Sequence, residues 1–185
     1  MTFDIAEYDH RLTGFWSDIQ GHMPFLKETA ESYDRPVIIE LGVRSGQSTS
    51  ALLAGIAGNG GELWSCDIDQ PSVPEHWRDL PEWHLLVADD LSPEAQAWLP
   101  AQCDVLFIDT SHTVEQTLGE LRAYVPRVKP GGIVLLHDTE WAPQGDEQLA
   151  EPGGPVAEAL NTYCAETGRS WVNRAGSYGM GVLKV

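Results

Sequence analysis

The fold of this chain is decided by residues 37–46, VIIELGVRSG. The stretch begins with an apolar, β-branched run, 37–41, which is interrupted only by Glu40 and predicts a short buried strand. Gly42 and Gly46 then predict a turn, and residues 48–57 beyond it have the pattern of a helix. A buried strand, a glycine turn and a helix in this order are typical of a parallel α/β sheet.

Strand and helix patterns alternate along the rest of the chain. Further strands are predicted at 63–66, 83–88, 104–108, 133–136, 170–174 and 178–184, and further helices at 94–99, 114–125 and 156–167. The last two strands flank a short turn at 175–177, so we expect them to pair as an antiparallel hairpin at one edge. The prediction is a single α/β domain with a doubly wound, mostly parallel, seven-stranded Rossmann-like sheet.

The N-terminal region has a different character. Residues 3–33 have helical spacing, interrupted at Pro24, and Arg35-Pro36 breaks the chain before the first strand. We therefore expect residues 1–34 to form a helical segment that packs on a domain made of residues 35–185.

Composition excludes several classes of partner. The chain has 185 residues with 28 Asp and Glu against 11 Lys and Arg, a net charge of −17. A field of this sign repels nucleic acids and anionic membranes, so neither is expected as a partner. The three cysteines form no CxxC pair, which is typical of buried thiols in a reducing compartment. With an acidic N-terminus and no apolar run of membrane-spanning length, a soluble cytoplasmic protein is predicted.

The spacing of the glycine turn excludes two common nucleotide motifs. A dinucleotide fingerprint, G-x-G-x-x-G, would need glycine where Arg44 and Gln47 stand. A phosphate-binding loop would need lysine after Gly46, where Gln47 stands. The turn then either approaches another ligand closely or is an ordinary connection between strand and helix.

Acidic residues follow the next two predicted strands. Asp67 lies where a carboxylate can accept both hydroxyls of a ribose; the alternative is that it caps a turn. Asp89 and Asp90 suit the amino edge of an adenine; the alternative is a helix N-cap ahead of residues 92–94. Ligands of such sheets bind at the carboxyl ends of the strands.

Acids and histidines follow the two strands after these. Asp109 and His112 come after the strand at 104–108, and His137 and Asp138 come after the strand at 133–136. Together they form an acid–base or metal-binding constellation. His137 has the alternative of a satisfied histidine in the core.

Taken together, these residues resemble class I S-adenosylmethionine-dependent methyltransferases. The pattern E-x-G-x-x-x-G at residues 40–46 is similar to their first motif, Asp67 to their ribose-binding acid and Pro130-Gly131-Gly132 to the turn before their fifth strand. Residues 103–140, with FIDxxH, KPGG and LLHD, resemble the small O-methyltransferase-like group (methyltransferase 24 type), which is related to macrolide-sugar and catechol O-methyltransferases. The resemblance covers residues 35–140, and 155–185 by topology.

The resemblance implies S-adenosylmethionine as cofactor and a set of residues to bind it: Glu40, Gly42, Val43, Arg44, Gly46, Ser48, Asp67, Ile68, Asp89, Asp90 and Asp109. It also implies Mg²⁺ held by Asp109, Asp138 and Thr139, with His137 as the alternative to Thr139. Thr139 stands where the metal-dependent relatives have asparagine, and His137 where they have a small residue. His112 stands where the catechol enzymes keep a lysine base, so His112 and Asp109 are the predicted catalytic residues.

The predicted function is methyl transfer to a hydroxyl of a small metabolite, such as a sugar or a secondary metabolite. Two alternatives stay open: a cofactor-binding module without catalysis, and a metal-dependent hydrolase. Expected walls of the acceptor pocket are the long segment 139–155 with Trp141, and N-terminal aromatic residues for which plain helix packing is the alternative: Phe15, Trp16, His22 and Phe25. The pocket is expected to be open or completed by a second copy of the chain.

Overall fold

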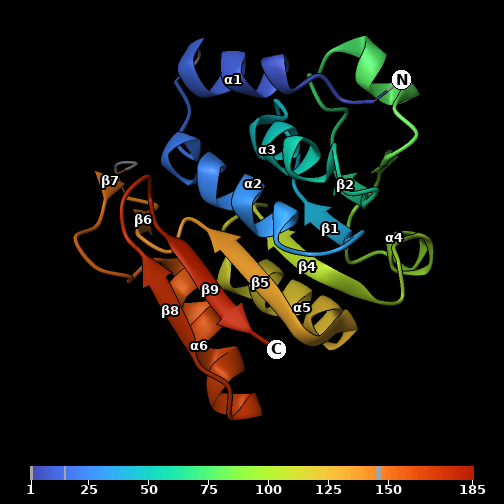
Figure 1. Ribbon diagram of the computed structural model, residues 1–185. Helices are drawn as coiled ribbons and strands as arrows, with labels where there is room; N and C mark the ends of the chain where they lie inside the picture. Colours follow the sequence, from blue (N-terminus) through green and yellow to red (C-terminus); the bar gives the residue numbers. More distant parts are fainter. Residues whose placement is uncertain (1, 15, 145–146) are drawn as a thin grey trace.

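A central sheet of seven strands organises the computed structural model, which describes residues 2–14, 16–144 and 147–185. The strand order is β3-β2-β1-β4-β5-β9-β8 (Figure 1). The strands are β1 (Val37–Leu41), β2 (Glu62–Asp67), β3 (Trp83–Val87), β4 (Cys103–Ile108), β5 (Val128–His137), β8 (Trp171–Arg174) and β9 (Met180–Lys184). Strands β1 to β5 are parallel, and β9 runs antiparallel to β5 and β8. The predicted sheet and its C-terminal hairpin are confirmed.

Helices cover both faces of the sheet (Figure 1). One face packs against α1 (Ile5–Gly14), α2 (Met23–Glu31) and α3 (Gln47–Ile56), and the other against α4 (Pro93–Trp98), α5 (Val114–Tyr124) and α6 (Pro155–Thr167). Within β1, Ile38 belongs to the first core and Ile39 and Leu41 to the second. Apolar side chains buried on both faces explain why β1 reads as an unbroken apolar run. Short 3₁₀ turns lie at η1 (Gln20–His22), η2 (Glu75–Asp79) and η3 (Val125–Arg127).

Three local expectations were wrong. The helical N-terminus breaks before η1 rather than at Pro24, which lies in the first turn of α2, where its missing N–H costs nothing. Strand β5 begins at Val128 instead of 133, so the turn sequence 130–132 lies within the strand, next to an irregularity in its pairing with β4. The segment 139–155 contains a small antiparallel pair, β6 (Trp141–Ala142) and β7 (Glu147–Gln148).

The order of the strands fixes where a ligand can bind. The chain leaves β1 towards β2 and β3 and returns on the other side through β4 and β5, so the carboxyl ends of β1 and β4 form the switch point of the sheet. The backbone ladder continues past these ends, with Asp109 N donating to Leu41 O at 2.8 Å and Gly42 N to Cys66 O at 2.9 Å. Among the described helices, none is long and apolar enough to cross a membrane.

Candidate active site

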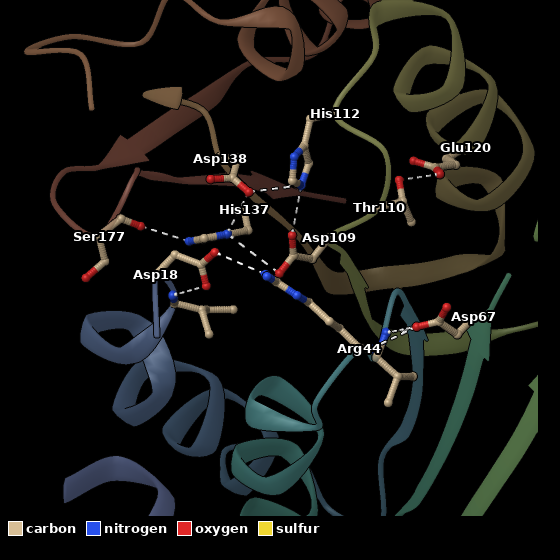
Figure 2. Close-up of polar contacts among 12 residues, drawn as sticks. Asp18, Arg44, Asp67, Asp109, Thr110, His112, Glu120, His137, Asp138 and Ser177 are labelled. Carbon is tan, nitrogen blue, oxygen red and sulfur yellow. Dashed lines mark hydrogen bonds and ion pairs between the residues drawn. The ribbon is translucent and has the colours of Figure 1, made fainter. Parts of the chain in front are cut away.

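The turn after β1 is held by the carboxylate of Asp67 at the end of β2. Asp67 Oδ2 accepts hydrogen bonds from Val43 N and Arg44 N, each at 2.8 Å (Figure 2), and its Oδ1 accepts from Asp69 N at 2.9 Å. Arg44 has a φ of 51°, a left-handed conformation that these bonds help to hold. The turn-capping role considered for Asp67 is therefore present, and binding of a ribose stays a prediction.

Glu40, near the end of β1, stabilises the same turn from the interior of the protein. It is fully buried, and its carboxyl group accepts from Ser48 Oγ at 2.7 Å, Thr49 Oγ1 at 3.0 Å and Ser65 Oγ at 2.6 Å. These contacts join β1 to the first turn of α3 and to β2. Burial, against the hydrogen bonds of the three hydroxyls, raises the pKa of Glu40 to about 7.

Glu40→Gln is expected to change how stability depends on pH. Below the unfolded-state pKa of 4.5 the carboxyl is protonated in both states; as the pH rises towards 7, the unfolded chain releases the proton first. The free energy of unfolding of the wild type should therefore fall between about pH 5 and 8, by on the order of 3 kcal/mol from this group. Urea unfolding at several pH values should show that the free energy of unfolding of Glu40→Gln no longer falls over this pH range. The control Glu94→Gln changes an exposed residue and should keep the fall seen in the wild type. Parallel curves for wild type and Glu40→Gln would contradict the assignment.

Two cavities meet at the turn. The β2 cavity, of about 340 Å³, and the His112 cavity, of about 540 Å³, share five residues: Gly42, Val43, Arg44, Asp109 and Thr110. The β2 cavity is also lined by Cys66, Asp67, Ile68, Asp89, Asp90, Ser111 and Gln116. The His112 cavity is also lined by Trp16, Ser17, Asp18, Ile19, Ser45, Gln47, Ser48 and His112. Of the predicted cofactor residues, Glu40 and Gly46 are absent from the described lining of both.

The two acids after β3 have different surroundings. Asp89 Oδ1 accepts from Leu91 N at 2.9 Å, while the N-cap of α4 is Ser92, whose Oγ accepts from Ala95 N at 3.1 Å, so the N-cap alternative for the acids is wrong. Asp90 is buried and accepts from Gln116 Nε2 at 2.8 Å. Its burial and then the neighbouring carboxylate of Glu120 raise the pKa of Asp90 to about 8.

Sequence reasoning missed three residues on this side of the site. Gln116 Nε2 donates to Asp90 and, at 3.0 Å, to Glu120 Oε1, which also accepts from Thr110 Oγ1 at 2.7 Å. Gln116 and Glu120 are four residues apart on α5, a spacing that places both on one helix face. That spacing was the available signal, but nothing in the sequence linked this face to Asp90.

The acids and histidines that follow β4 and β5 converge (Figure 2). We call Asp109, His112, His137 and Asp138 the Asp–His cluster. His112 Nε2 lies 3.1 Å from Asp109 Oδ1 and 2.9 Å from Asp138 Oδ2. His137 Nδ1 lies 3.0 Å from Asp138 Oδ2 and 3.6 Å from Asp109 Oδ2. His112 and Asp138 have φ values of 53° and 65°, which turn the chain sharply at both positions.

Charges within the cluster are balanced. Burial opposes ionisation of Asp109 and Asp138, but the neighbouring histidines outweigh it and hold both carboxyl pKa values below their usual range. Burial likewise lowers the pKa of His112, but the contacts with Asp109 and Asp138 outweigh it and raise that pKa to about 10. The pKa of His137 is raised well above its usual value, with burial opposing the same two carboxylates. The two histidines and the two carboxylates thus favour each other's charged forms.

The residues beside the cluster have other partners. His137 is buried, and its Nε2 lies 2.8 Å from the carbonyl oxygen of Ser177, so both ring nitrogens have partners. Thr139 is buried, and its Oγ1 donates to Asn173 Oδ1 on β8 at 2.6 Å. The hydrogen of the Thr139 hydroxyl thus points to the β8 side, and a contact of its oxygen with a metal stays a prediction. Among the described His, Cys, Asp and Glu residues, the group that could hold a metal is Asp109, His137 and Asp138.

Only some of the residues expected to form the walls of the acceptor pocket lie at the site. Trp16 lines the mouth of the His112 cavity and is 81% exposed, and the ring of Trp141 lies 5.3 Å from that of His112. Phe25 instead packs under Arg174, with the guanidinium 4.0 Å from its ring centroid, and His22 is buried against the ring of His137 at 5.9 Å. These two side chains therefore pack against β8 and β5 and are not among the described residues that line the His112 cavity. Phe15, and 145–146 within the segment 139–155, lie outside the described residues.

The matching family model and three similar solved structures are those of methyltransferases. A protein-family model described as a methyltransferase domain matches residues 39–139. The SAH-bound methyltransferase PaMTH1 of Podospora anserina has a similar fold, with a TM-score of 0.68, 16% identity, and 97% of this chain and 86% of that chain covered. The O-methyltransferase from Bacillus cereus in complex with SAH gives a TM-score of 0.61 at 14% identity, covering 100% of this chain and 93% of that one.

A third similar structure is that of a longer protein. MycE, a methyltransferase from the mycinamycin biosynthetic pathway in complex with Mg, SAH and mycinamycin VI, gives a TM-score of 0.68 at 16% identity. The match covers 99% of this chain but 53% of MycE, so this chain spans about half the length of that protein. The comparison with curated protein sequences found no match.

Proposed function

The chain belongs to the methyltransferase family whose model matches residues 39–139, and we propose that this S-adenosylmethionine-dependent enzyme methylates a hydroxyl oxygen of a small metabolite. One observation carries the proposal: Asp109 lines both cavities, and His112 lines the larger one directly beside it. A cofactor in the β2 cavity and an acceptor in the His112 cavity would then meet at a carboxylate and a histidine.

The β2 cavity suits the adenosine part of the cofactor. Asp67, Asp89 and Asp90 line it beside Ile68, and the carboxyl groups of the three acids can accept from ribose hydroxyls and from an adenine amino group. The methionine part would pass the shared turn at Gly42–Arg44 and extend towards Ser48 in the larger cavity. Glu40 contributes by fixing that turn rather than by touching the cofactor.

Chemistry at the junction needs a proton acceptor near the hydroxyl. The acceptor oxygen would attack the methyl carbon in line with the sulfonium, which would leave as a neutral thioether, and the hydroxyl proton would pass to His112 Nε2. The contacts with Asp109 and Asp138 favour the protonated ring, so Nε2 accepts this proton only in the neutral form of His112, which is the minor form at neutral pH. Asp109 and Asp138, both within 3.1 Å of this nitrogen, orient the ring and stabilise the imidazolium that forms. Asp109 and Asp138 end adjacent strands and would hold a divalent metal, which when bound lowers the pKa of the hydroxyl and orients it.

The acceptor class follows from the mouth of the larger cavity. Trp16 lines this cavity together with the polar side chains of Asp18, Arg44 and His112, and the ring of Trp141 lies next to that of His112. This combination suits a sugar, whose faces stack on aromatic rings while its hydroxyls bond to polar groups. The complex of MycE with mycinamycin VI supports a small-molecule acceptor. We also infer that segment 1–34, through residues 16–19, forms one wall of this cavity on a domain of residues 35–185, and that the cavity is either open or completed by a second copy of the chain.

Asp67→Ala is expected to weaken cofactor binding without abolishing the fold. Ribose hydroxyls lose a charged acceptor worth about 1.5–3 kcal/mol, so affinity for S-adenosylhomocysteine should fall on the order of tenfold to a hundredfold by calorimetry. Asp67→Asn, which keeps one oxygen for the two turn amides, should lose less. Unchanged affinity in a folded Asp67→Ala protein would remove Asp67 from the site.

The same preparation tests the function itself. Wild-type protein with S-adenosylmethionine should form S-adenosylhomocysteine when given glycosides with free sugar hydroxyls or catechols. Binding of the cofactor product with no turnover across this panel would favour a binding module. Metal-dependent hydrolysis without any affinity for the cofactor product would favour a hydrolase and refute the proposal.

A further inference from the structure

The ligand set of the Asp–His cluster differs from an all-oxygen one. Ligand atoms of Asp109, His137 and Asp138 all lie within 4.8 Å of one another. The hydroxyl of Thr139, the oxygen ligand expected beside the two acids, instead donates to Asn173. The other atoms that face both carboxylates are ring nitrogens, Nδ1 of His137 and Nε2 of His112. His112 has the role of base in the proposed function, which leaves Nδ1 of His137 as the third ligand.

The other nitrogen of His137 fixes which ring atom could bind a metal. Nε2 lies 2.8 Å from the Ser177 carbonyl, which can only accept, so Nε2 carries the hydrogen. In the neutral ring the lone pair is then on Nδ1, directed at Asp109 and Asp138. A histidine that donates to a backbone carbonyl through one nitrogen while presenting the other is the usual arrangement of a metal ligand.

The carbonyl that orients His137 is itself held. Ser177 and Tyr178 have φ values of 46° and 61°, and Ser177 Oγ accepts from Gly21 N at 3.1 Å, which ties the turn between β8 and β9 to the segment before α2. The buried ring of His22 packs edge-on against His137. The ring of His137 is thus fixed by contacts with Ser177, His22 and Asp109, which belong to three separate segments. His137 takes part in no step of the proposed reaction.

We propose that Asp109, Asp138 and His137 Nδ1 bind a first-row transition metal ion, such as Mn²⁺, Fe²⁺, Co²⁺ or Zn²⁺, in preference to Mg²⁺. Mg²⁺ favours oxygen ligands in near-ideal octahedral geometry, whereas imidazole suits the transition metals. The inference rests on the proposed function, because the ion would act on the acceptor hydroxyl at the same carboxylates. The competing state is a metal-free cluster in which His137 keeps a proton on Nδ1 and supplies the positive charge.

The test is direct metal binding by the whole protein, without cofactor or acceptor. After treatment with chelator and its removal, calorimetric titrations with Co²⁺, Mn²⁺ and Mg²⁺ should give affinities for Co²⁺ and Mn²⁺ at least tenfold above that for Mg²⁺. Nitrogen NMR of protein labelled in its histidines should show the His137 Nδ1 signal, assigned with His137→Gln, shifting when Zn²⁺ is added. Mg²⁺ binding as tight as Co²⁺, no binding at all, or an unchanged Nδ1 signal would overturn the proposal.

Variants separate this site from adventitious metal binding. His137→Glu replaces the nitrogen by oxygen and should lower the ratio of Co²⁺ to Mg²⁺ affinity at least tenfold, and Asp109→Asn should remove most binding of both. His76→Gln changes an exposed histidine that bonds Glu7 and should leave the affinities unchanged. If His137→Glu does not fold, the NMR shift in the wild type decides.

Failure here is distinguishable from failure of the proposed function. S-Adenosylhomocysteine binding with no metal binding would refute the metal alone, and metal binding with no affinity for the cofactor product would refute the function alone.

Discussion

His112→Gln is expected to lower kcat for methyl transfer by about 10²–10⁴, the usual contribution of a general base. The side chain of His112 lines the acceptor side of the site and is absent from the described lining of the β2 cavity, so affinity for S-adenosylhomocysteine should stay within a few-fold. The measurement is formation of S-adenosylhomocysteine with the best acceptor of the panel, beside calorimetry on the same preparation.

The matched control is His76→Gln, which removes a surface contact of η2 with Glu7 and should keep full activity. The pH–rate profile adds a second readout, because loss of a base removes the limb of the profile that its deprotonation produces. An enzyme that keeps its kcat without His112 would show that the proton leaves by another route.

Gly42→Ala is expected to destabilise the whole domain. The residue has a φ of +89°, and a Cβ atom there would lie 1.9 Å from the carbonyl oxygen of Asp109 and 2.7 Å from its carbon. Left-handed strain alone costs about 1–2 kcal/mol in a residue with a side chain. The overlap with backbone atoms adds to this cost, so the loss in free energy of unfolding should exceed about 3 kcal/mol. Single substitutions cause losses of this size only when they introduce a specific structural defect.

Gly131→Ala separates the two contributions to this loss. Gly131 has a φ of +85°, nearly that of Gly42, but within the described structure no atom lies within 4 Å of the Cβ position. It should lose only the cost of the left-handed conformation, about 1–2 kcal/mol. Urea unfolding of the two variants checks this, and equal losses would show that the ends of β1 and β4 move apart freely.

Positions at strand ends were predictable because the sheet is parallel. Once β1, β2, β4 and β5 are recognised as parallel strands, Asp67, Asp109 and Asp138 must meet at one edge of the sheet, whatever the loops do. Strong apolar runs bounded by glycine and proline made those strands visible. The ends of these strands were predicted less well where a strand contains residues that usually mark turns. Strand β5 is the example, because it includes a proline and two glycines.

Directions of side chains were not predictable in the same way. Asp138 has a left-handed conformation, and on either side of it the ring of His137 lies against the Asp138 carboxylate while the hydroxyl of Thr139 bonds to Asn173. Spacing in the sequence did not separate these two directions. Glu40 looked like a cofactor residue because the motif contains it, yet its partners Ser48, Thr49 and Ser65 come together only when β1, β2 and α3 pack. Such contacts depend on tertiary packing, which spacing in the sequence does not encode.

Asp109 makes the two halves of the site thermodynamically inseparable. Its backbone carbonyl packs on Gly42 at the shared turn, and its carboxylate faces His112 and His137. A ligand that shifts this residue from one side changes the free energy of binding on the other, and such coupling is reciprocal. By whatever factor an occupant of the β2 cavity changes affinity at the Asp–His cluster, an occupant of the cluster changes affinity in the cavity by the same factor.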